Sequence, residues 1–311
     1  MRATGERNAP YRPGPPMTVS ERIVVTGASG QLGRLVVADL LRIAPEAHVI
    51  GIVRNPAAAK DLTDRGVELR VARYEDAASV AAALAGADKV LLISSSEARR
   101  RIPQHRHVID AAKAAGAKLF VYTSILHADT NPMALAVEHR ETEALIRSSG
   151  LPFVLLRNGW YTENYTAGLA AALRRGAVLG AARDGRVSSA ARADFAAAGA
   201  TVLASPANQA GRVYELAGDS AYTLTELVAE IARQSGRPVV YRDLSEADYK
   251  AALQADGLPE EFAALYAESD VKTAVGALHD ESRQLRGLIG RPTTTMAQSV
   301  TAALAPVTSI A

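Results

Sequence analysis

A strand that runs directly into a glycine-spaced turn and then into a helix constrains this chain more than any other stretch. Apolar residues at 23–25 lead into Thr26-Gly27-Ala28-Ser29-Gly30-Gln31-Leu32-Gly33, and apolar residues then recur at helical spacing. In such a turn the first glycine lets the chain leave the strand sharply, the second lets a diphosphate approach bare backbone, and the third lets the helix lie close to the strand. The N–H groups that open the helix favour an anion. The stretch predicts a dinucleotide site, although a tight turn that binds nothing can have the same spacing.

Further apolar segments alternate with helical ones as far as residue 156. The predicted strands cover 48–53, 67–71, 89–93, 119–122 and 153–156, and the predicted helices cover 56–65, 77–84, 100–115 and 135–148. Apolar strands that alternate with helices form a parallel sheet covered on both faces. Right-handed crossovers make that sheet doubly wound. We therefore predict an α/β protein with a Rossmann-type doubly wound parallel sheet.

The pattern loosens beyond residue 157. We expect helices over 160–174, 194–204, 224–234, 259–268 and 280–289, strands over 212–216 and 239–244, and a frayed end over 302–311. The predicted units are a nucleotide-binding domain at 21–157 and a smaller mixed α/β substrate region at 158–311 that partly returns to the main sheet. Residues 1–20 carry four prolines and no apolar stretch, which predicts a disordered extension or a start site placed ahead of Met17.

Composition excludes several classes of protein. The chain of 311 residues has no cysteine, so disulfides, thiolate catalysis and sulfur-ligated metals are excluded. Its net charge is +2 and no basic stripe is visible, which argues against a nucleic-acid surface. No apolar run approaches the length of a membrane span, and no secretory signal opens the chain. We predict a cytoplasmic protein with no metal, no nucleic-acid partner and no membrane contact.

Ligands on a doubly wound sheet lie at the carboxyl ends of the strands. The second predicted strand ends in Arg54, where an NAD site has an acidic residue, and no carboxylate follows until Asp61. An arginine fork suits a 2′-phosphate, so this position favours NADPH, although a surface arginine at a strand end is also common. The fourth strand ends in Ser94, Ser95 and Ser96. These small residues would let a cofactor ribose lie against the backbone, or would cap the next helix.

Aromatic residues concentrate after the sixth predicted strand. The stretch Asn158-Gly159-Trp160-Tyr161-Thr162-Glu163 contains the only tryptophan of a chain with 5% aromatic residues. Its rings could wall a nicotinamide and a flat acceptor, or could anchor the following helix. The hydroxyl groups of Ser124 and Tyr161 could bind an acceptor oxygen. We predict Ser124, Trp160 and Tyr161 as substrate-binding residues.

The chain lacks the Tyr-x-x-x-Lys pair with which short-chain reductases act on carbinols. If His139 stood at the lysine position, Leu135 would stand at the tyrosine position. His139 and Glu143 share a helix face, which favours a surface ion pair over a ribose contact by His139 and over a poorly supported metal site.

The missing acid suits one kind of acceptor. Hydride addition to a ketone needs a positioned proton donor, whereas a quinone leaves an anion whose conjugate acid has a pKa near ~10, by analogy with tyrosine. Positioning then matters more than acid–base catalysis, and no catalytic residue is predicted.

These motifs resemble those of the bacterial NAD(P)H:quinone oxidoreductase 2 family, an NmrA-like branch of the atypical short-chain dehydrogenases to which triphenylmethane reductase is related. The resemblance runs from Glu21 to Val300 and includes Leu288-Ile289-Gly290-Arg291-Pro292. It implies hydride transfer from NADPH to a small-molecule quinone. It also implies cofactor contacts from Gly27, Ala28, Ser29, Gly30, Gln31, Leu32, Arg54, Ser94, Ser95, Ser96, Asn158, Gly159, Trp160, Tyr161, Thr162 and Glu163.

Two alternatives remain open beside the quinone reductase. One is a reductase of another flat conjugated acceptor, such as a triphenylmethane dye. The other is an NmrA-like sensor that binds the dinucleotide without turnover. The aromatic stretch after the sixth strand favours an acceptor pocket, and hence an enzyme.

Overall fold

A parallel sheet forms the centre of the molecule. The computed structural model describes residues 20–95, 97 and 100–308. The predicted extension at 1–20, apart from Ser20, therefore lies outside the described residues, as do Ser96 and residues 98–99 and 309–311. Within the described residues, the strand order of the main sheet is β3-β2-β1-β4-β5-β6-β9, and every neighbouring pair is parallel. The strands are β1 (Arg22–Val25), β2 (His48–Val53), β3 (Glu68–Val71), β4 (Lys89–Leu92), β5 (Leu119–Ile125), β6 (Phe153–Asn158) and β9 (Arg212–Leu216).

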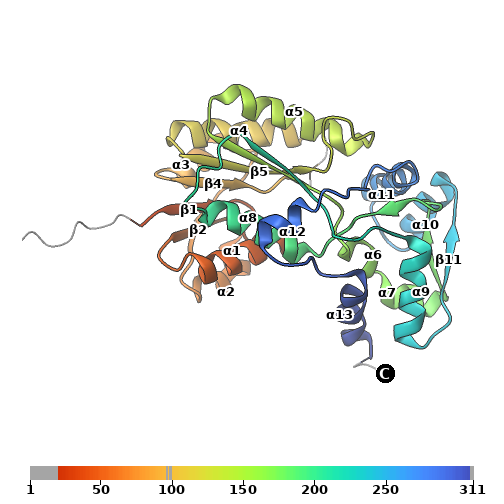
Figure 1. Cartoon of the computed structure of the whole chain (residues 1–311). Helices are drawn as coiled ribbons and strands as arrows, with labels where there is room; N and C mark the ends of the chain where they lie inside the picture. The colour runs from red at the N-terminus through yellow and green to blue at the C-terminus, as the bar shows by residue number, and fades with distance from the viewer. Residues whose placement is uncertain (1–19, 96, 98–99, 309–311) are drawn as a thin grey trace, which may run out of the picture.

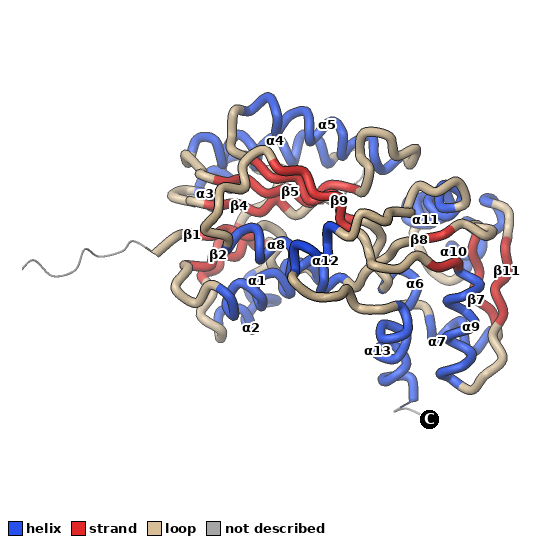
Figure 2. Tube along the Cα trace, in the orientation of Figure 1, coloured by secondary structure: helices blue, strands red, loops and turns tan. Residues whose placement is uncertain are grey.

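Helices cover both faces of this sheet (Figures 1 and 2). One face carries α1 (Gln31–Ile43), α8 (Arg192–Ala204) and α12 (Gln284–Ile289), with the short η1 (Pro56–Ala59) and α2 (Lys60–Thr63) at its edge. The other face carries α3 (Ala77–Leu84), α4 (Arg101–Ala114) and α5 (Ala134–Ser149). Because each face of the sheet is buried, the inner strands β1, β2, β4, β5 and β6 are mostly apolar, whereas the edge strands β3 and β9 carry charged residues. The predicted doubly wound α/β fold is confirmed.

The remaining elements form a smaller lobe with its own apolar core (Figure 2). Two strand pairs, β7 (Ala177–Gly180) with β11 (Val240–Asp243) and β8 (Arg186–Val187) with β10 (Tyr222–Thr223), lie among helices. The helices are α6 (Glu163–Thr166), α7 (Leu169–Arg175), α9 (Leu224–Ser235), α10 (Glu246–Ala255), α11 (Glu260–Thr273) and α13 (Met296–Thr308). The strand β9 joins the main sheet, and α8 and α12 pack on it.

Several expected boundaries in this half were wrong. The expected frayed end at 302–311 is helical as far as Thr308, because α13 runs from Met296 to Thr308 and buries Val300 and Leu304 against the lobe. The expected helix over 160–174 is broken at Gly168 into α6 and α7. The helix α10 escaped the sequence reading because its residues are all exposed or half-buried, which leaves a weak apolar period.

The strand order places a crevice beside the glycine-rich turn. From β1 the chain moves to β2 and β3 on one side, and then crosses back to β4 on the other side of β1. Such a topological switch point opens a gap at the carboxyl ends of the strands, where ligands bind in sheets of this kind. The turn at 26–30 follows β1 and therefore lies at this gap.

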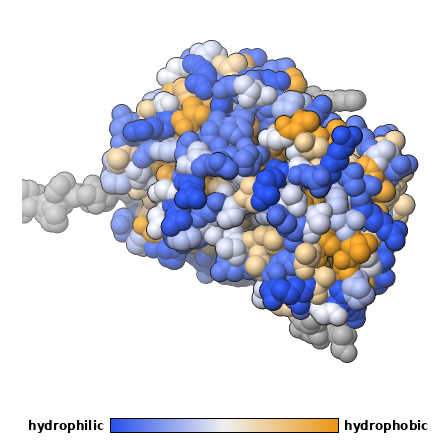
Figure 3. All heavy atoms as spheres, turned by 45° about the vertical axis from the view of Figure 1, so that its right-hand side comes forward, coloured by the Kyte–Doolittle hydropathy of each residue, from blue (hydrophilic) through white to orange (hydrophobic). Residues whose placement is uncertain are grey.

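The outer surface is mixed in character. On the face shown in Figure 3, hydrophilic residues cover most of the surface and hydrophobic ones gather in small groups. Among the described residues, no helix combines the length and the apolar character that a crossing of the bilayer requires.

Candidate functional site

A cavity of about 350 Å³ lies at the carboxyl ends of β1, β2, β3 and β4. Each of these strands contributes to it through the residues that end or follow it. The lining residues are Gly27, Ser29, Gly30, Ile52, Val53, Arg54, Ala72, Tyr74, Glu75, Ile93, Ser94, Ser95 and Glu97. The cavity therefore occupies the topological switch point of the sheet.

The glycine-rich turn contributes Gly27, Ser29 and Gly30 to the lining of the cavity. Gly27 adopts a φ of 59°, which L side chains rarely adopt, and its carbonyl accepts a hydrogen bond from the N–H of Gly30 at 2.9 Å. A Cβ on Gly33 would lie 2.3 Å from the oxygen of Gly27, so the helix approaches the turn as closely as glycine permits. In the described structure no side chain caps α1 at Gly30. The N–H groups of its first turn therefore remain available to a ligand.

Arg34 holds this turn in place from the first turn of α1. Its Nε donates to the carbonyl of Ser29 at 3.0 Å, and its Nη2 donates to the carbonyl of Ala58 at 2.7 Å. Its Nη1 also pairs with Asp61. The guanidinium thus ties the turn to η1 and α2, and it holds the pKa of the Asp61 carboxyl below its usual value.

Tyr74 is a cavity residue that the sequence analysis missed. Its hydroxyl donates to Thr26 Oγ1 at 2.5 Å and lies 3.2 Å from the carbonyl oxygen of Ile93. Burial raises the pKa of the Tyr74 phenol, so the group stays a neutral donor. Its position just after β3, at the carboxyl end of a parallel strand, is the sequence signal that could have predicted it.

Arg54 lies at the cavity with two carboxylates beside it. Its side chain is 75% exposed, and its Nη1 lies 3.8 Å from Glu97 Oε1. Glu75 and Glu97 both line the same cavity. The expectation that no carboxylate accompanies Arg54 was wrong, because it considered only residues near Arg54 in the sequence. Residues that follow β3 and β4 reach the same edge of a parallel sheet.

The segment 158–163 joins the end of β6 to the start of α6, and none of its residues lines this cavity. The amide of Asn158 is 6% exposed, and its Oδ1 has no hydrogen-bond partner among the described residues. The N–H of Gly159 donates to Leu216 at 2.7 Å, and the Thr162 hydroxyl lies 2.8 Å from that of Ser189. Both carboxylate oxygens of Glu163 accept from the N–H of Arg192 at 3.0 Å.

The two aromatic residues of this segment pack between elements. The ring of Trp160 meets Tyr266 edge-on at 6.0 Å, in the core of the smaller lobe. The ring of Tyr161 meets Phe195 edge-on at 5.3 Å and carries the guanidinium of Arg192 at 4.6 Å from its centroid. These contacts match the anchoring role that was the alternative to a substrate wall.

Ser124 belongs to a buried charge cluster on the other face of the sheet. Its hydroxyl donates to Glu143 Oε1 at 2.6 Å, and Arg157 grips the same carboxylate at 2.9 and 2.6 Å. Burial opposes the charge on Arg157, but hydrogen bonds to Glu143, Asp129 and Glu215 outweigh burial and raise the pKa of the guanidinium. The predicted substrate contact of Ser124 does not fit this arrangement, because its hydroxyl is already committed to Glu143.

The predicted surface pair of His139 and Glu143 was wrong. Helix α5 packs this face against the sheet, so both side chains are buried. The Nδ1 of His139 lies 2.8 Å from the hydroxyl of Tyr122, while Glu143 turns to Arg157. Burial holds the pKa of His139 well below its usual value. The two side chains do not converge on a common site.

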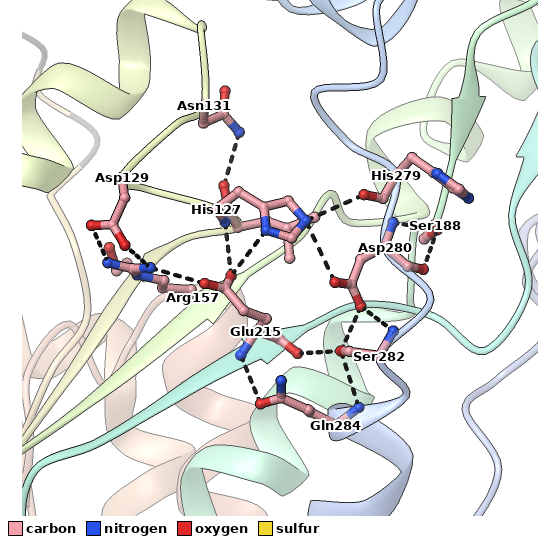
Figure 4. Close-up of polar contacts among 12 residues, drawn as sticks. His127, Asp129, Asn131, Arg157, Ser188, Glu215, His279, Asp280, Ser282 and Gln284 are labelled. Atoms are coloured by element: carbon pink, nitrogen blue, oxygen red, sulfur yellow. Dashed lines mark hydrogen bonds and ion pairs between the residues drawn. The ribbon is translucent and has the colours of Figure 1, made fainter.

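The charge cluster continues into the smaller lobe through His127. Figure 4 shows Arg157 facing Asp129 and Glu215, and the ring of His127 between Glu215 and Asp280. The Nε2 of His127 lies 3.4 Å from Asp280 Oδ2, and its backbone N–H donates to Glu215 at 2.8 Å. His127 has a φ of 53°, which turns the chain after β5 toward this contact. The cluster therefore fastens the lobe to the ends of β5, β6 and β9.

Comparisons with known proteins agree with this geometry. A family model described as NAD(P)H-binding matches residues 27–206. Quinone oxidoreductase 2 of Escherichia coli is 55% identical over 278 residues, which cover 89% of this chain and 97% of that protein.

Two solved structures share the whole fold. The crystal structure of the NADPH-dependent E. coli quinone oxidoreductase 2 with NADPH has a TM-score of 0.87 at 54% identity, and covers 90% of this chain and 99% of that one. The Citrobacter sp. triphenylmethane reductase with NADP(H) also has a TM-score of 0.87, at 36% identity, over 91% of this chain and 100% of that one.

Proposed function

This chain belongs to the NAD(P)H-binding quinone oxidoreductase 2 family, and we propose that it transfers a hydride from NADPH to a small quinone. The observation that carries the proposal is the cavity at the switch point, which is lined by the glycine turn, Arg54, Ser94 and Ser95. Its position and donors are those that a dinucleotide requires. The relative that is 55% identical, a named quinone oxidoreductase, supports the choice of acceptor.

The residues of the cavity fit this cofactor. The uncapped first turn of α1 offers backbone N–H groups to a diphosphate, and Arg54 offers a cation to a 2′-phosphate. The unpartnered Oδ1 of Asn158 would accept from a carboxamide N–H, the group that a nicotinamide carries. We assign cofactor binding to Gly27, Ser29, Gly30, Arg54, Ser94, Ser95 and Asn158, and we keep Ala28, Gln31 and Leu32 as neighbours of the diphosphate.

The proposed reaction depends on how the quinone is placed against the cofactor rather than on an acid catalyst. NADPH supplies the hydride when it is bound. The one phenol that lines the described cavity, Tyr74, already donates its proton to Thr26. If His139 stood at the lysine position of the short-chain reductases, Leu135 would stand at their tyrosine position, where it offers no acid. A quinone suits such a site, because the reduced anion has a conjugate acid of pKa near ~10 and takes its proton from water.

The test is a set of turnover assays on the purified protein. NADPH oxidation is followed with a benzoquinone, a naphthoquinone and a triphenylmethane dye, and NADP⁺ reduction with a secondary alcohol. We expect turnover with the quinones and none with the alcohol. Turnover with the dye alone would mean that the acceptor is a triphenylmethane dye rather than a quinone. NADPH binding without any turnover would identify a sensor and overturn the proposal. The cytoplasmic location stays a prediction.

A further inference from the structure

The segment that follows β4 is held by side chains rather than by neighbouring strands. The N–H of Ile93 donates to Thr26 Oγ1 at 3.0 Å, and the N–H of Ser94 donates to Thr123 Oγ1 at 2.9 Å. Neighbouring strands have diverged at this point to open the crevice, so the backbone groups need other partners. Ser94 and Ser95 line the cavity, so the partners of these groups set the shape of the cofactor site.

Two side chains of α4 hold the peptide groups of Ser95 from both sides. The N–H of Ser95 donates to His105 Nε2 at 3.0 Å, and its carbonyl accepts from Arg101 Nε at 2.8 Å. The side chain of His105 is fully buried, and Arg101 is also buried and pairs with Glu138 at 2.9 Å. Neither side chain lines the cavity, so both act on it through Ser95.

The contact of His105 defines the position of its proton. Since Nε2 accepts from Ser95, the proton of the neutral ring is on Nδ1, which lies 3.0 Å from Thr142 Oγ1. The Thr142 hydroxyl donates in turn to the carbonyl of Glu138 at 2.9 Å. Burial lowers the pKa of His105 to about 3, which keeps the ring neutral.

We propose that His105 is a positioning residue for NADPH: its unprotonated Nε2, oriented by Thr142, fixes the Ser95 peptide in the cofactor cavity. This inference rests on the proposed function in that the cavity takes NADPH. It predicts that the affinity for NADPH depends on an acceptor at the Nε2 position, although His105 does not touch the cofactor.

The experiment compares two substitutions of the same side chain. His105→Leu removes the acceptor and leaves the Ser95 N–H unsatisfied, which should raise the NADPH dissociation constant and its KM about tenfold. His105→Gln keeps an amide oxygen near the place of Nε2 and should restore most of the affinity. The kcat and the KM for the quinone should stay near the wild-type values in both variants. His48→Leu, at the amino end of β2 and away from the cavity, is the matched control.

A second pair of variants tests the orientation of the proton. Thr142→Val removes the acceptor of the Nδ1 proton. The ring is then free to adopt the tautomer that is protonated on Nε2, which cannot accept the hydrogen bond from the N–H of Ser95. The NADPH affinity of Thr142→Val should fall, whereas Thr142→Ser should bind as the wild type does. This pair decides the matter if His105→Leu fails to fold.

Binding is measured by NADPH titration without an acceptor, so the inference does not depend on turnover. Wild-type protein that binds NADPH but reduces no quinone contradicts the proposed function and leaves this test intact. A folded His105→Leu variant with wild-type affinity would overturn the inference. The inference would also be overturned if a folded His105→Gln variant bound NADPH as weakly as His105→Leu, or if Thr142→Val bound NADPH with wild-type affinity.

Discussion

At the scale of single residues, the charge of Arg54 is partly compensated before any phosphate arrives. Glu97 lies 3.8 Å from its guanidinium, and Glu75 lines the same cavity. A 2′-phosphate would therefore compete with Glu97 for the same cation. The exposure of Arg54 screens both interactions, so each contributes less than it would in a buried site.

Arg54→Ala should raise the NADPH dissociation constant about tenfold and leave that of NADH unchanged, because only NADPH carries the 2′-phosphate. This corresponds to ~1.4 kcal/mol, near the lower end of the range for hydrogen bonds to charged groups. Glu97→Gln should act in the opposite direction and strengthen NADPH binding. Paired titrations with NADPH and NADH measure both effects. Equal weakening of the two cofactors in Arg54→Ala would show that Arg54 does not contact the phosphate.

At the scale of elements, the glycines of the β1–turn–α1 unit leave backbone groups accessible to the cofactor because they carry no side chains. A Cβ at position 30 would lie 3.2 Å from the carbonyl oxygen of Gly27. This distance is tight for an alanine methyl group and tighter still for a branched side chain. The same side chain would cover the N–H groups at the start of α1. The helix itself would still pack on the sheet through its buried leucines and valines.

Gly30→Val should abolish NADPH binding while the protein keeps its fold. Circular dichroism reports the fold, and an NADPH titration reports the site. Gly287→Val is the matched control, since that glycine is exposed in α12 with no neighbouring atom near the added Cβ. Normal NADPH binding by Gly30→Val would mean that the turn has only a structural role.

The Arg157 cluster connects elements that are far apart in the sequence. Its guanidinium joins β6 to the end of β5, to α5 and to β9. Arg157→Leu would leave the carboxylate of Glu143 buried without the guanidinium that contacts both of its oxygens, and breaking a buried pair in this way costs about 3–5 kcal/mol. Urea unfolding measures the loss. Arg233→Leu, which removes an exposed pair on α9, should change little. A loss from Arg157→Leu no larger than this control would contradict the buried role.

At the scale of the whole molecule, two buried imidazoles link stability to pH. His105 has a folded-state pKa of about 3 and the pKa of His139 is also lowered, so the unfolded chain binds more protons than the folded one below the usual histidine pKa of 6.5. Their contribution is complete above pH 6.5 and is lost as the pH falls toward 3. Asp270 acts in the opposite direction, because burial raises its pKa to about 7 and the folded state holds its proton.

His105→Gln isolates one imidazole from these opposing groups. The difference in unfolding free energy between wild type and this variant should be constant above pH 6.5, and should change by up to ~1.4 kcal/mol for each pH unit below it. Urea unfolding at a series of pH values measures the difference. A difference that is the same at all pH values would mean that His105 titrates normally in the folded protein.

The sequence by itself determined the class of fold and the position of the turn. Strand and helix periods and the glycine spacing act through neighbours in the chain, so the β1–turn–α1 unit and the alternation up to β6 can be predicted locally. The positions of Arg54, Ser94 and Ser95 at the cavity could be predicted for the same reason, since each residue lies just after a strand end.

Only the tertiary structure decided which polar groups meet. Three contacts at or near the site join residues from different strands and helices. They are the contacts of Glu97 with Arg54, of His105 with Ser95 and of Ser124 with Glu143. A sequence pattern shows that a side chain shares a face with its neighbours, but it does not show what packs against that face. The partner of a buried polar group depends on strand order and on which helix covers which face, and these are set by the packing of the whole sheet.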